Sequence, residues 1–140
     1  MTHLAVLCIG SNSDDRKLQM DLAEKFILLS LGAIEHSSGV YETVAESLPD
    51  GTDPFLNQVC VVRTALASPA DMVRSIKSYE RQCGRLPQDK SCGSVVVDID
   101  VVLWDGQILR PADYARPHFR LGMSAVETKM ACGAGTLKLV

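Results

Sequence analysis

The chain has 140 residues, of which 46% are hydrophobic and 22% are charged, and its formal net charge is −3. This length fits one domain spanning residues 1–140, and no apolar run approaches the roughly 18–20 residues that cross a bilayer. The slightly acidic balance disfavours a general nucleic-acid binder, because phosphate affinity depends on clustered Lys and Arg. The five cysteines lack Cys-x2-Cys spacing, and no basic segment precedes the first apolar stretch. We therefore predict reduced thiols, no zinc site, no membrane partner and a cytoplasmic domain of unspecified oligomeric state.

The first part of the chain predicts a strand, a helix and a second strand. Residues 4–9 form a short apolar run that is typical of a central buried strand. Residues 10–15 predict a turn and a helix start with acidic residues in the first turn, and Gly32 ends the helix. Residues 33–44 are small or β-branched and predict the second strand. The apolar residues at helical spacing are Leu18, Leu22, Phe26 and Leu29.

The middle of the chain predicts a loop, a third strand and a second helix. Residues 45–54 are rich in Glu, Asp, Pro and Gly, as in surface loops that carry function, and residues 57–66 predict a strand. Ser68 is a predicted N-cap, followed by Pro69 at the first helical position and an acid three residues after the cap. The predicted apolar face contains Met72, Ile76, Tyr79 and Cys83, and Gly84 ends the helix.

The last part of the chain contains the strongest strand pattern, over residues 95–103. A long polar loop, residues 86–94, precedes it, and Asp105-Gly106 predicts a hairpin turn into residues 107–109. Residues 121–130 predict a short helix and residues 137–140 a final strand. The resulting β-α-β-β-α-β order predicts an α+β, ferredoxin-like fold, in which helices pack on one face of an antiparallel sheet.

Two aspartates on the strongest strand are the first candidate site. Asp98 and Asp100 lie two positions apart, so their carboxylates point to the same face, about 7 Å apart along the strand. Such a pair suits Mg²⁺, which is commonly held by one or two carboxylates and substrate phosphates. The alternative is the solvated face of a sheet. The apolar side, predicted to pack on the helices, contains Val95, Val97, Ile99, Val101 and Leu103.

Three further clusters have both a functional and a structural interpretation. Glu80 is predicted on the exposed side of the second helix, and Arg85 either binds phosphate or interacts with the helix dipole. His118, between Arg116 and Arg120 in sequence, either contacts nucleotide phosphates or lies in a surface turn. The segment from Phe55 to Asn57 either binds a planar heterocycle by stacking and hydrogen bonding or is an ordinary start of a strand.

Taken in order, these segments resemble the 6-hydroxymethyl-7,8-dihydropterin pyrophosphokinase family of folate biosynthesis. The resemblance covers roughly residues 4–120 and is fairly specific as an ordered set, although each motif alone is weak. The matching segments are Ile9–Asn12, Ser37–Thr43, Phe55–Asn57, Glu80–Arg85, Asp98–Asp100 and Pro117–Phe119.

The resemblance implies a ferredoxin-like fold and transfer of pyrophosphate from ATP to the pterin's hydroxymethyl oxygen, with release of AMP. It implies that Asp98 and Asp100 are catalytic and hold two Mg²⁺ ions. Metal ions and positioning of the reactants provide most of the catalysis in phosphoryl transfer. The implied partners are two small molecules, ATP and the hydroxymethyl-dihydropterin. The implied pterin-binding residues are Thr43, Phe55 and Asn57, and the implied ATP-binding residues are Glu80, Arg85, His118 and Phe119.

The chain also departs from the family pattern. Val95–Val97 replaces a segment with a phosphate-binding Arg, and the lid loop has Pro87 and Cys92 where an Arg and a Trp are expected. The C-terminal part is shorter than expected, and Arg116, Arg120 or Lys90 are the candidates to supply the absent positive charge. The alternative function is therefore a catalytically weak or inactive paralogue that binds a nucleotide or pterin or serves as a regulatory domain.

Overall fold

The computed structural model of the chain describes residues 1–44, 54–84 and 95–132. Among these residues no helix is long and apolar enough to cross a membrane. The strands are β1 His3–Ser11, β2 Gly32–Ser37, β3 Tyr41–Thr43, β4 Phe55–Thr64, β5 Asp98–Trp104 and β6 Gln107–Ile108. The helices are α1 Arg16–Phe26, the π-helical turn η1 Ile27–Leu31, α2 Pro69–Gln82, α3 Pro111–Tyr114 and α4 Pro117–Cys132.

The strands form one antiparallel sheet in the order β2-β4-β1-β5-β6, and β3 pairs with β4 beyond the end of β2. The predicted second strand is therefore two short strands along one edge of β4. At the break the Ser38 hydroxyl accepts a hydrogen bond from the Val59 amide at 2.9 Å, so a side chain replaces a backbone partner. The predicted β-α-β-β-α-β order and the ferredoxin-like fold are confirmed.

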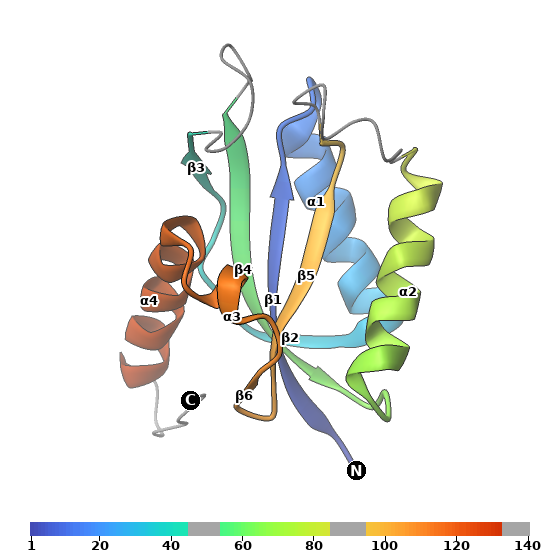
Figure 1. The fold of residues 1–140 in the computed structure, drawn as a ribbon, viewed down its shortest axis with the longest axis vertical. Coiled ribbons are helices and arrows are strands. Elements are labelled where there is room, and N and C mark those ends of the chain that lie inside the picture. The colour runs from blue at the N-terminus through green and yellow to red at the C-terminus, as the bar shows by residue number, and fades with distance from the viewer. Residues whose placement is uncertain (45–53, 85–94, 133–140) are drawn as a thin grey trace.

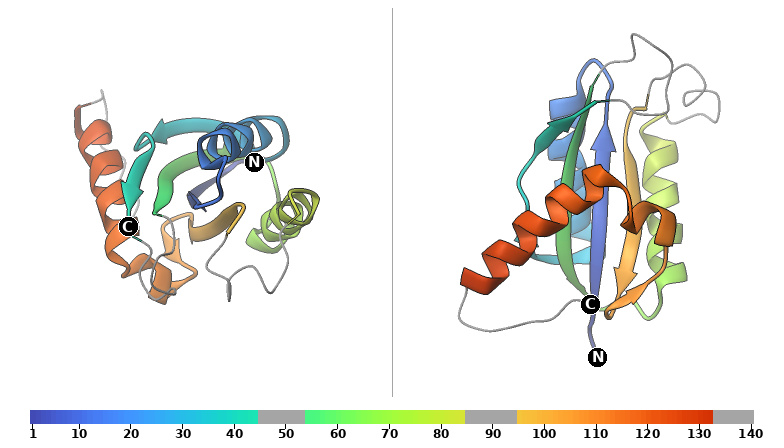
Figure 2. Two further views of the ribbon diagram at one scale, coloured as in Figure 1. Left: turned by 90° about the horizontal axis from the view of Figure 1, so that it is seen from above. Right: turned by 60° about the vertical axis from the view of Figure 1, so that its left-hand side comes forward.

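Helices cover both faces of the sheet (Figures 1 and 2). Helices α1 and α2 lie on one face, as predicted, and their core includes Ile27 and Met72. Helix α4 packs on the opposite face through Phe119 and Met123, and this second layer is additional to the predicted fold. The predicted helix over residues 121–130 is in fact longer and begins at Pro117, while predicted strand 137–140 lies outside the described residues.

The start and the buried face of α1 differ from the prediction. The helix begins at Arg16, so its first turn contains no acid, and the Asp15 side chain makes no capping hydrogen bond. Leu18, Leu22 and Leu29 are exposed, and of the predicted apolar set Phe26 alone packs against the core. The residues that face the sheet are a second set at helical spacing, namely Met20, Ala23, Ile27 and Leu31.

Helix α2 follows the prediction at its start and along its core face. The Ser68 hydroxyl accepts a hydrogen bond from the Asp71 amide at 3.2 Å, which satisfies one of the free N–H groups at the helix start. Met72 and Ile76 are fully buried, and Tyr79 and Cys83 pack against the same core.

A β-bulge in β5 changes the predicted faces of its last residues. Val6 pairs with Leu103 and Leu7 with Val101, so Val102 is the extra residue. Beyond the bulge the alternation reverses, and Leu103 packs on the α4 side, not under α1 and α2 as predicted. The strand begins at Asp98, later than predicted, and the hairpin at Asp105-Gly106 is confirmed, with positive φ at both residues.

Candidate functional site

The cross-strand register places the acid pair on the sheet face that α4 partly covers. Asp98 lies opposite Gly10 of β1, and Gly10 lies opposite Asn57 of β4. In the next row Asp100 lies opposite Cys8. Because directly opposite residues of antiparallel strands share a face, these side chains point to the same side of the sheet.

A cavity of about 460 Å³ opens where this face carries only small side chains in its centre. Gly10 has no side chain, and an added Cβ there would lie 3.4 Å from Asn57 Oδ1 and 3.6 Å from Phe55 Cδ1. Cys8, two residues before Gly10 on β1, contributes only a small thiol. Burial raises the pKa of this thiol, so it stays protonated. The lining residues are Cys8, Gly10, Thr43, Val44, Phe55, Asn57, Val95, Asp98, Asp100, Arg110, Asp113, Arg116 and His118.

The electrostatics of the cavity are dominated by the two aspartates. Burial and the neighbouring Asp98 carboxylate raise the pKa of Asp100 to about 7, while Arg110 acts in the opposite direction. Arg110 Nη2 lies 3.8 Å from Asp100 Oδ1, too far for a strong hydrogen bond. The charged form of Asp100 is thus disfavoured, and a bound cation would stabilise it.

The residues predicted to bind a pterin lie along one wall. Asn57 is buried, and its Nδ2 donates a hydrogen bond to Thr43 Oγ1 at 2.5 Å. Phe55 lies two positions before Asn57 on β4 and opposite Thr43 of β3, so its ring borders the same wall. The wall thus offers an aromatic ring beside an amide and a hydroxyl, which suits a flat heterocycle with polar edges.

The residues predicted to bind ATP do not all line the cavity. His118 lines the cavity, in the first turn of α4. Phe119 is 1% exposed and belongs to the core under α4, so the prediction that it contacts ATP is not supported by its position. Arg85 lies outside the described residues, as do Pro87, Lys90 and Cys92.

Glu80 is 6% exposed, and its predicted place on the exposed side of α2 is wrong. Its Oε2 accepts a hydrogen bond from the backbone N–H of Ile99 at 2.9 Å. Ile99 lies between the two aspartates, so Glu80 fixes the backbone that carries them. This carboxylate approaches β5 from the α2 side of the sheet.

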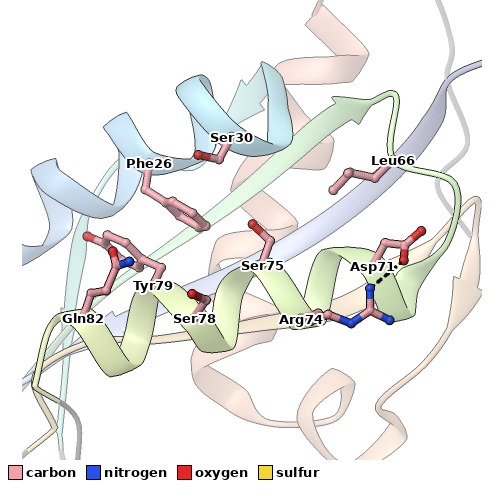
Figure 3. Close-up of a pocket in the computed structure, with 9 residues that line it drawn as sticks. All are labelled: Phe26, Ser30, Leu66, Asp71, Arg74, Ser75, Ser78, Tyr79 and Gln82. Atoms are coloured by element: carbon pink, nitrogen blue, oxygen red, sulfur yellow. Dashed lines mark hydrogen bonds and ion pairs between the residues drawn. The ribbon is translucent and has the colours of Figure 1, made fainter.

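A second hollow, of about 610 Å³, lies on the other side of the sheet between α1–η1 and α2 (Figure 3). The rings of Phe26 and Tyr79 stack in it with centroids 4.2 Å apart. Asp71 and Arg74 form an ion pair at its rim at 3.0 Å. The remaining lining residues are Ser30, Leu66, Ser75, Ser78 and Gln82. We call this hollow the groove and the one beside the acid pair the cavity.

Comparison with known proteins identifies the family. A model of the family described as 7,8-dihydro-6-hydroxymethylpterin-pyrophosphokinase (HPPK) matches residues 6–128. The chain belongs to the HPPK family. The "Folic acid synthesis protein FOL1" of Dictyostelium discoideum is 32% identical over 116 residues, which are 83% of this chain and 17% of that protein. The "Folate synthesis bifunctional protein" of Chlamydia caviae is 32% identical over 130 residues, with 86% of this chain and 28% of that protein covered.

Solved structures of the HPPK-DHPS protein of Plasmodium falciparum share the fold. The wild type with pterin and p-hydroxybenzoate has a TM-score of 0.61 at 19% identity, over 76% of this chain and 28% of that one. The wild type with SDX-DHP has a TM-score of 0.63 at 18% identity, over 76% and 30% of the two chains. This HPPK-family chain thus spans less than a third of the length of these relatives.

The HPPK family uses ATP and Mg²⁺, and the residues of the cavity fit a magnesium ion. Within the described residues no group of three or more His, Cys, Asp or Glu is arranged to hold a metal. Mg²⁺ does not need such a cage, because it is usually held by one or two carboxylates, waters and substrate phosphates. Burial, and after it the neighbouring Asp98 carboxylate, raises the pKa of Asp100, and a divalent cation would stabilise the charged form of this carboxylate.

The Ile9–Asn12 segment that contributed to the HPPK resemblance has a structural role. Asn12 Oδ1 accepts a hydrogen bond from the Val95 amide at 2.6 Å, and the Asn12 amide donates to the Val95 carbonyl at 3.0 Å. This pair of bonds ties the chain just before β5 to the end of β1. Val95 lines the cavity, so the position where the family was expected to supply an Arg is apolar.

Two charged residues of the cavity were not among the candidates from the sequence. Arg110 and Asp113 come from the segment between the β5–β6 hairpin and α4, and Arg110 contacts Asp113 while approaching Asp100. Arg116, a candidate for the absent charge, also lines the cavity, whereas Arg120 lies over the Tyr114 ring, 4.7 Å from its centre. The spacing of residues 110, 113 and 116 is the signal that a helical turn would place them together.

Proposed function

We propose that this HPPK-family domain transfers pyrophosphate from ATP to 6-hydroxymethyl-7,8-dihydropterin in a Mg²⁺-dependent reaction that releases AMP. The observation that carries the proposal is the cavity. It has a pair of aspartates on one side and an amide, a hydroxyl and an aromatic ring on the other. One substrate needs cation-mediated binding of phosphates and the other needs a flat, polar-edged site, and the cavity offers both.

In the proposed reaction the pterin's hydroxymethyl oxygen attacks the β-phosphorus of ATP. A new O–Pβ bond forms, the bond between Pβ and the α,β-bridging oxygen breaks, and AMP leaves with that electron pair while the hydroxyl proton is released. Asp98 and Asp100 would hold two Mg²⁺ ions, which would neutralise the phosphates' charge and align the reactants when bound. Positioning by the protein supplies much of the remaining rate enhancement.

The other residues of the cavity have supporting roles in this proposal. Asn57 and Thr43 bind the edge of the pterin and Phe55 contacts its ring, so that the hydroxymethyl group faces the acid pair. His118 contacts the nucleotide from the start of α4. Glu80 does not touch substrate and acts by fixing the strand between Asp98 and Asp100.

One observation favours the second candidate function, a binding paralogue with little turnover. Val95, an apolar residue that lines the cavity, offers no charge to a phosphate. Loss of a charge-assisted phosphate contact weakens transition-state stabilisation, by roughly 3–4 kcal/mol where a single donor is removed.

The experiment that separates the two functions is a measurement of AMP formation from Mg·ATP with and without the hydroxymethyl-dihydropterin. Pterin-dependent AMP that is lost in Asp98→Ala supports the transferase. ATP and pterin binding in calorimetry without AMP would support the binding paralogue. If no AMP forms and ATP binding is the same in wild type and Asp98→Ala, the transferase proposal is wrong.

A further inference from the structure

Three charged residues around α3 form a network at the wall of the cavity. Asp113 contacts both arginines: Arg110 Nε donates to one carboxylate oxygen, and Arg116 Nε lies 3.2 Å from the other. The Asp113 side chain is 18% exposed, whereas those of Arg110 and Arg116 are 53% and 55% exposed. A mostly buried carboxylate thus holds two guanidinium groups that reach the solvent in the cavity.

The backbone explains why these three side chains meet. The Tyr114 amide donates to the Arg110 carbonyl at 2.9 Å, and the Arg116 amide donates to the Asp113 carbonyl at 3.1 Å. These bonds form one compact turn, which puts residues three apart on the same side. Pro111 fixes φ at the first helical position, so the turn is preorganised.

The contacts of the two arginines leave donors that suit an anion. Each guanidinium uses Nε toward Asp113, and its two terminal nitrogens carry four further N–H groups. Of these, Arg110 Nη2 faces Asp100 at 3.8 Å. Arg is the usual bidentate ligand of phosphate, and a guanidinium held in place loses less conformational entropy on binding.

We infer that Asp113 is a positioning residue, which orients Arg110 and Arg116 so that both bind phosphate oxygens of the nucleotide in the cavity. This inference rests on the proposed function, from which it takes the nucleotide. The network would supply the positive charge that the apolar Val95 does not. Arg110 would exchange its approach to Asp100 for a phosphate oxygen when the magnesium nucleotide binds.

The inference and simple electrostatics predict opposite effects for Asp113. Removing a negative charge beside an anion site should strengthen phosphate binding if the carboxylate acts only through its charge. If Asp113 acts by orienting the arginines, Asp113→Asn should weaken binding by about three- to tenfold, since the amide accepts hydrogen bonds but holds two cations less firmly.

The test measures binding of Mg·ATP and of magnesium tripolyphosphate by calorimetry, without pterin. Arg110→Gln and Arg116→Gln should each lower the affinity for both ligands by about tenfold to a hundredfold. Asp113→Asn should lower the affinity for both ligands when it is made in the wild-type protein. In the double variant Arg110→Gln/Arg116→Gln it should leave these affinities unchanged or raise them. The matched control is Arg120→Gln, which removes an exposed arginine outside the cavity, and thermal unfolding checks that each variant folds.

The outcomes separate this inference from the proposed function. If tripolyphosphate binding responds as expected but wild type forms no AMP, the network is an anion site and the transferase proposal is wrong. If wild type forms AMP but the arginine variants bind both ligands within twofold of wild type, the network has no such role. Stronger binding by Asp113→Asn alone would overturn the positioning role, and no binding of either ligand to wild type would overturn both proposals.

Discussion

The cavity and the groove lie on opposite sides of the same sheet, and the larger of the two has the less specific chemistry. The groove measures about 610 Å³ and the cavity about 460 Å³. In the groove Asp71 and Arg74 form an ion pair with each other at the rim. In the cavity Asp98 and Asp100 share one strand face, and the pKa of Asp100 is raised.

The difference teaches that two like charges held close together, more than volume, mark the candidate site. The groove is a space between two helices that both pack on the sheet, and it is lined by serines of α2 and by the stacked rings of Phe26 and Tyr79. The cavity exists because Gly10 and Cys8 leave room between polar residues of neighbouring strands. The following predictions test this contrast.

The largest expected effect is on turnover when an acid of the cavity is changed. Asp100→Asn should reduce pterin-dependent AMP formation by roughly 10²–10³-fold, because one carboxylate ligand of the metal is lost. The matched change in the groove, Asp71→Asn, should leave the rate within about twofold, since surface substitutions have small effects. Steady-state AMP release at saturating Mg·ATP measures both. An equal loss in the two variants would remove the contrast between the regions.

The next effect concerns pH and the stability of the metal-free protein. The pKa of Asp100 is raised from its ordinary 3.8 to about 7, so the folded protein binds a proton that the unfolded chain has released. Stability should therefore fall as pH rises from about 4 to about 7, by at most about 4 kcal/mol. Urea unfolding at pH 5 and pH 8 with a chelator measures this. Asp100→Asn should reduce the change of stability with pH, and Asp71→Asn should not. The same pH dependence of stability in wild type and both variants would contradict the raised pKa of Asp100.

A smaller effect is expected from the packing of α4 beside the cavity. A Cβ on Gly122 would lie 2.4 Å from both Tyr41 Oη and Val59 Cγ2, closer than atoms can approach. Gly122→Ala should therefore destabilise the fold by about 1–3 kcal/mol and lower AMP formation, as α4 carries His118. Urea unfolding and the AMP assay measure the two consequences. The control is Ser124→Ala, at an exposed position of the same helix, and unchanged stability in Gly122→Ala would show that α4 shifts without cost.

The smallest effects should come from polar residues of the groove. Arg74→Ala removes an exposed ion pair and should change stability by less than about 0.5 kcal/mol. The double variant Ser75→Ala/Ser78→Ala should likewise leave AMP formation unchanged. Thermal unfolding and the AMP assay check both variants. A clear loss of turnover in either would show that the groove contributes to the reaction after all.

Much of the architecture could be predicted because its signals are local. The Ser68 cap with Pro69 needs only its own helix, and the Asp105-Gly106 turn needs only its two strands. The acid pair was visible because the period of a strand puts alternate residues on one face. Thr43, Phe55, Asn57, Asp98, Asp100 and His118 were all candidates from the sequence, and all line one cavity.

The errors arose where two local patterns competed. Helix α1 has two apolar stripes at helical spacing, and the one chosen from the sequence contains Leu29, which is 87% exposed. Spacing alone cannot decide which stripe meets a sheet, since both have the same period. Glu80 is polar and was predicted at the surface, yet the Ile99 amide compensates its burial.

The sequence by itself determined the order of the main elements, the face shared by Asp98 and Asp100, and the resemblance to a family through an ordered set of motifs. The tertiary structure alone decided which stripe of α1 is buried and where the bulge in β5 reverses the alternation. It also brought Arg110, Asp113 and Arg116 to the wall beside the acids. The physical reason is that propensity and period act between neighbours in the chain, whereas burial, register and charge compensation depend on partners many residues away. A slightly acidic chain of 140 residues thus places Arg110 and Arg116 beside carboxylates of the cavity.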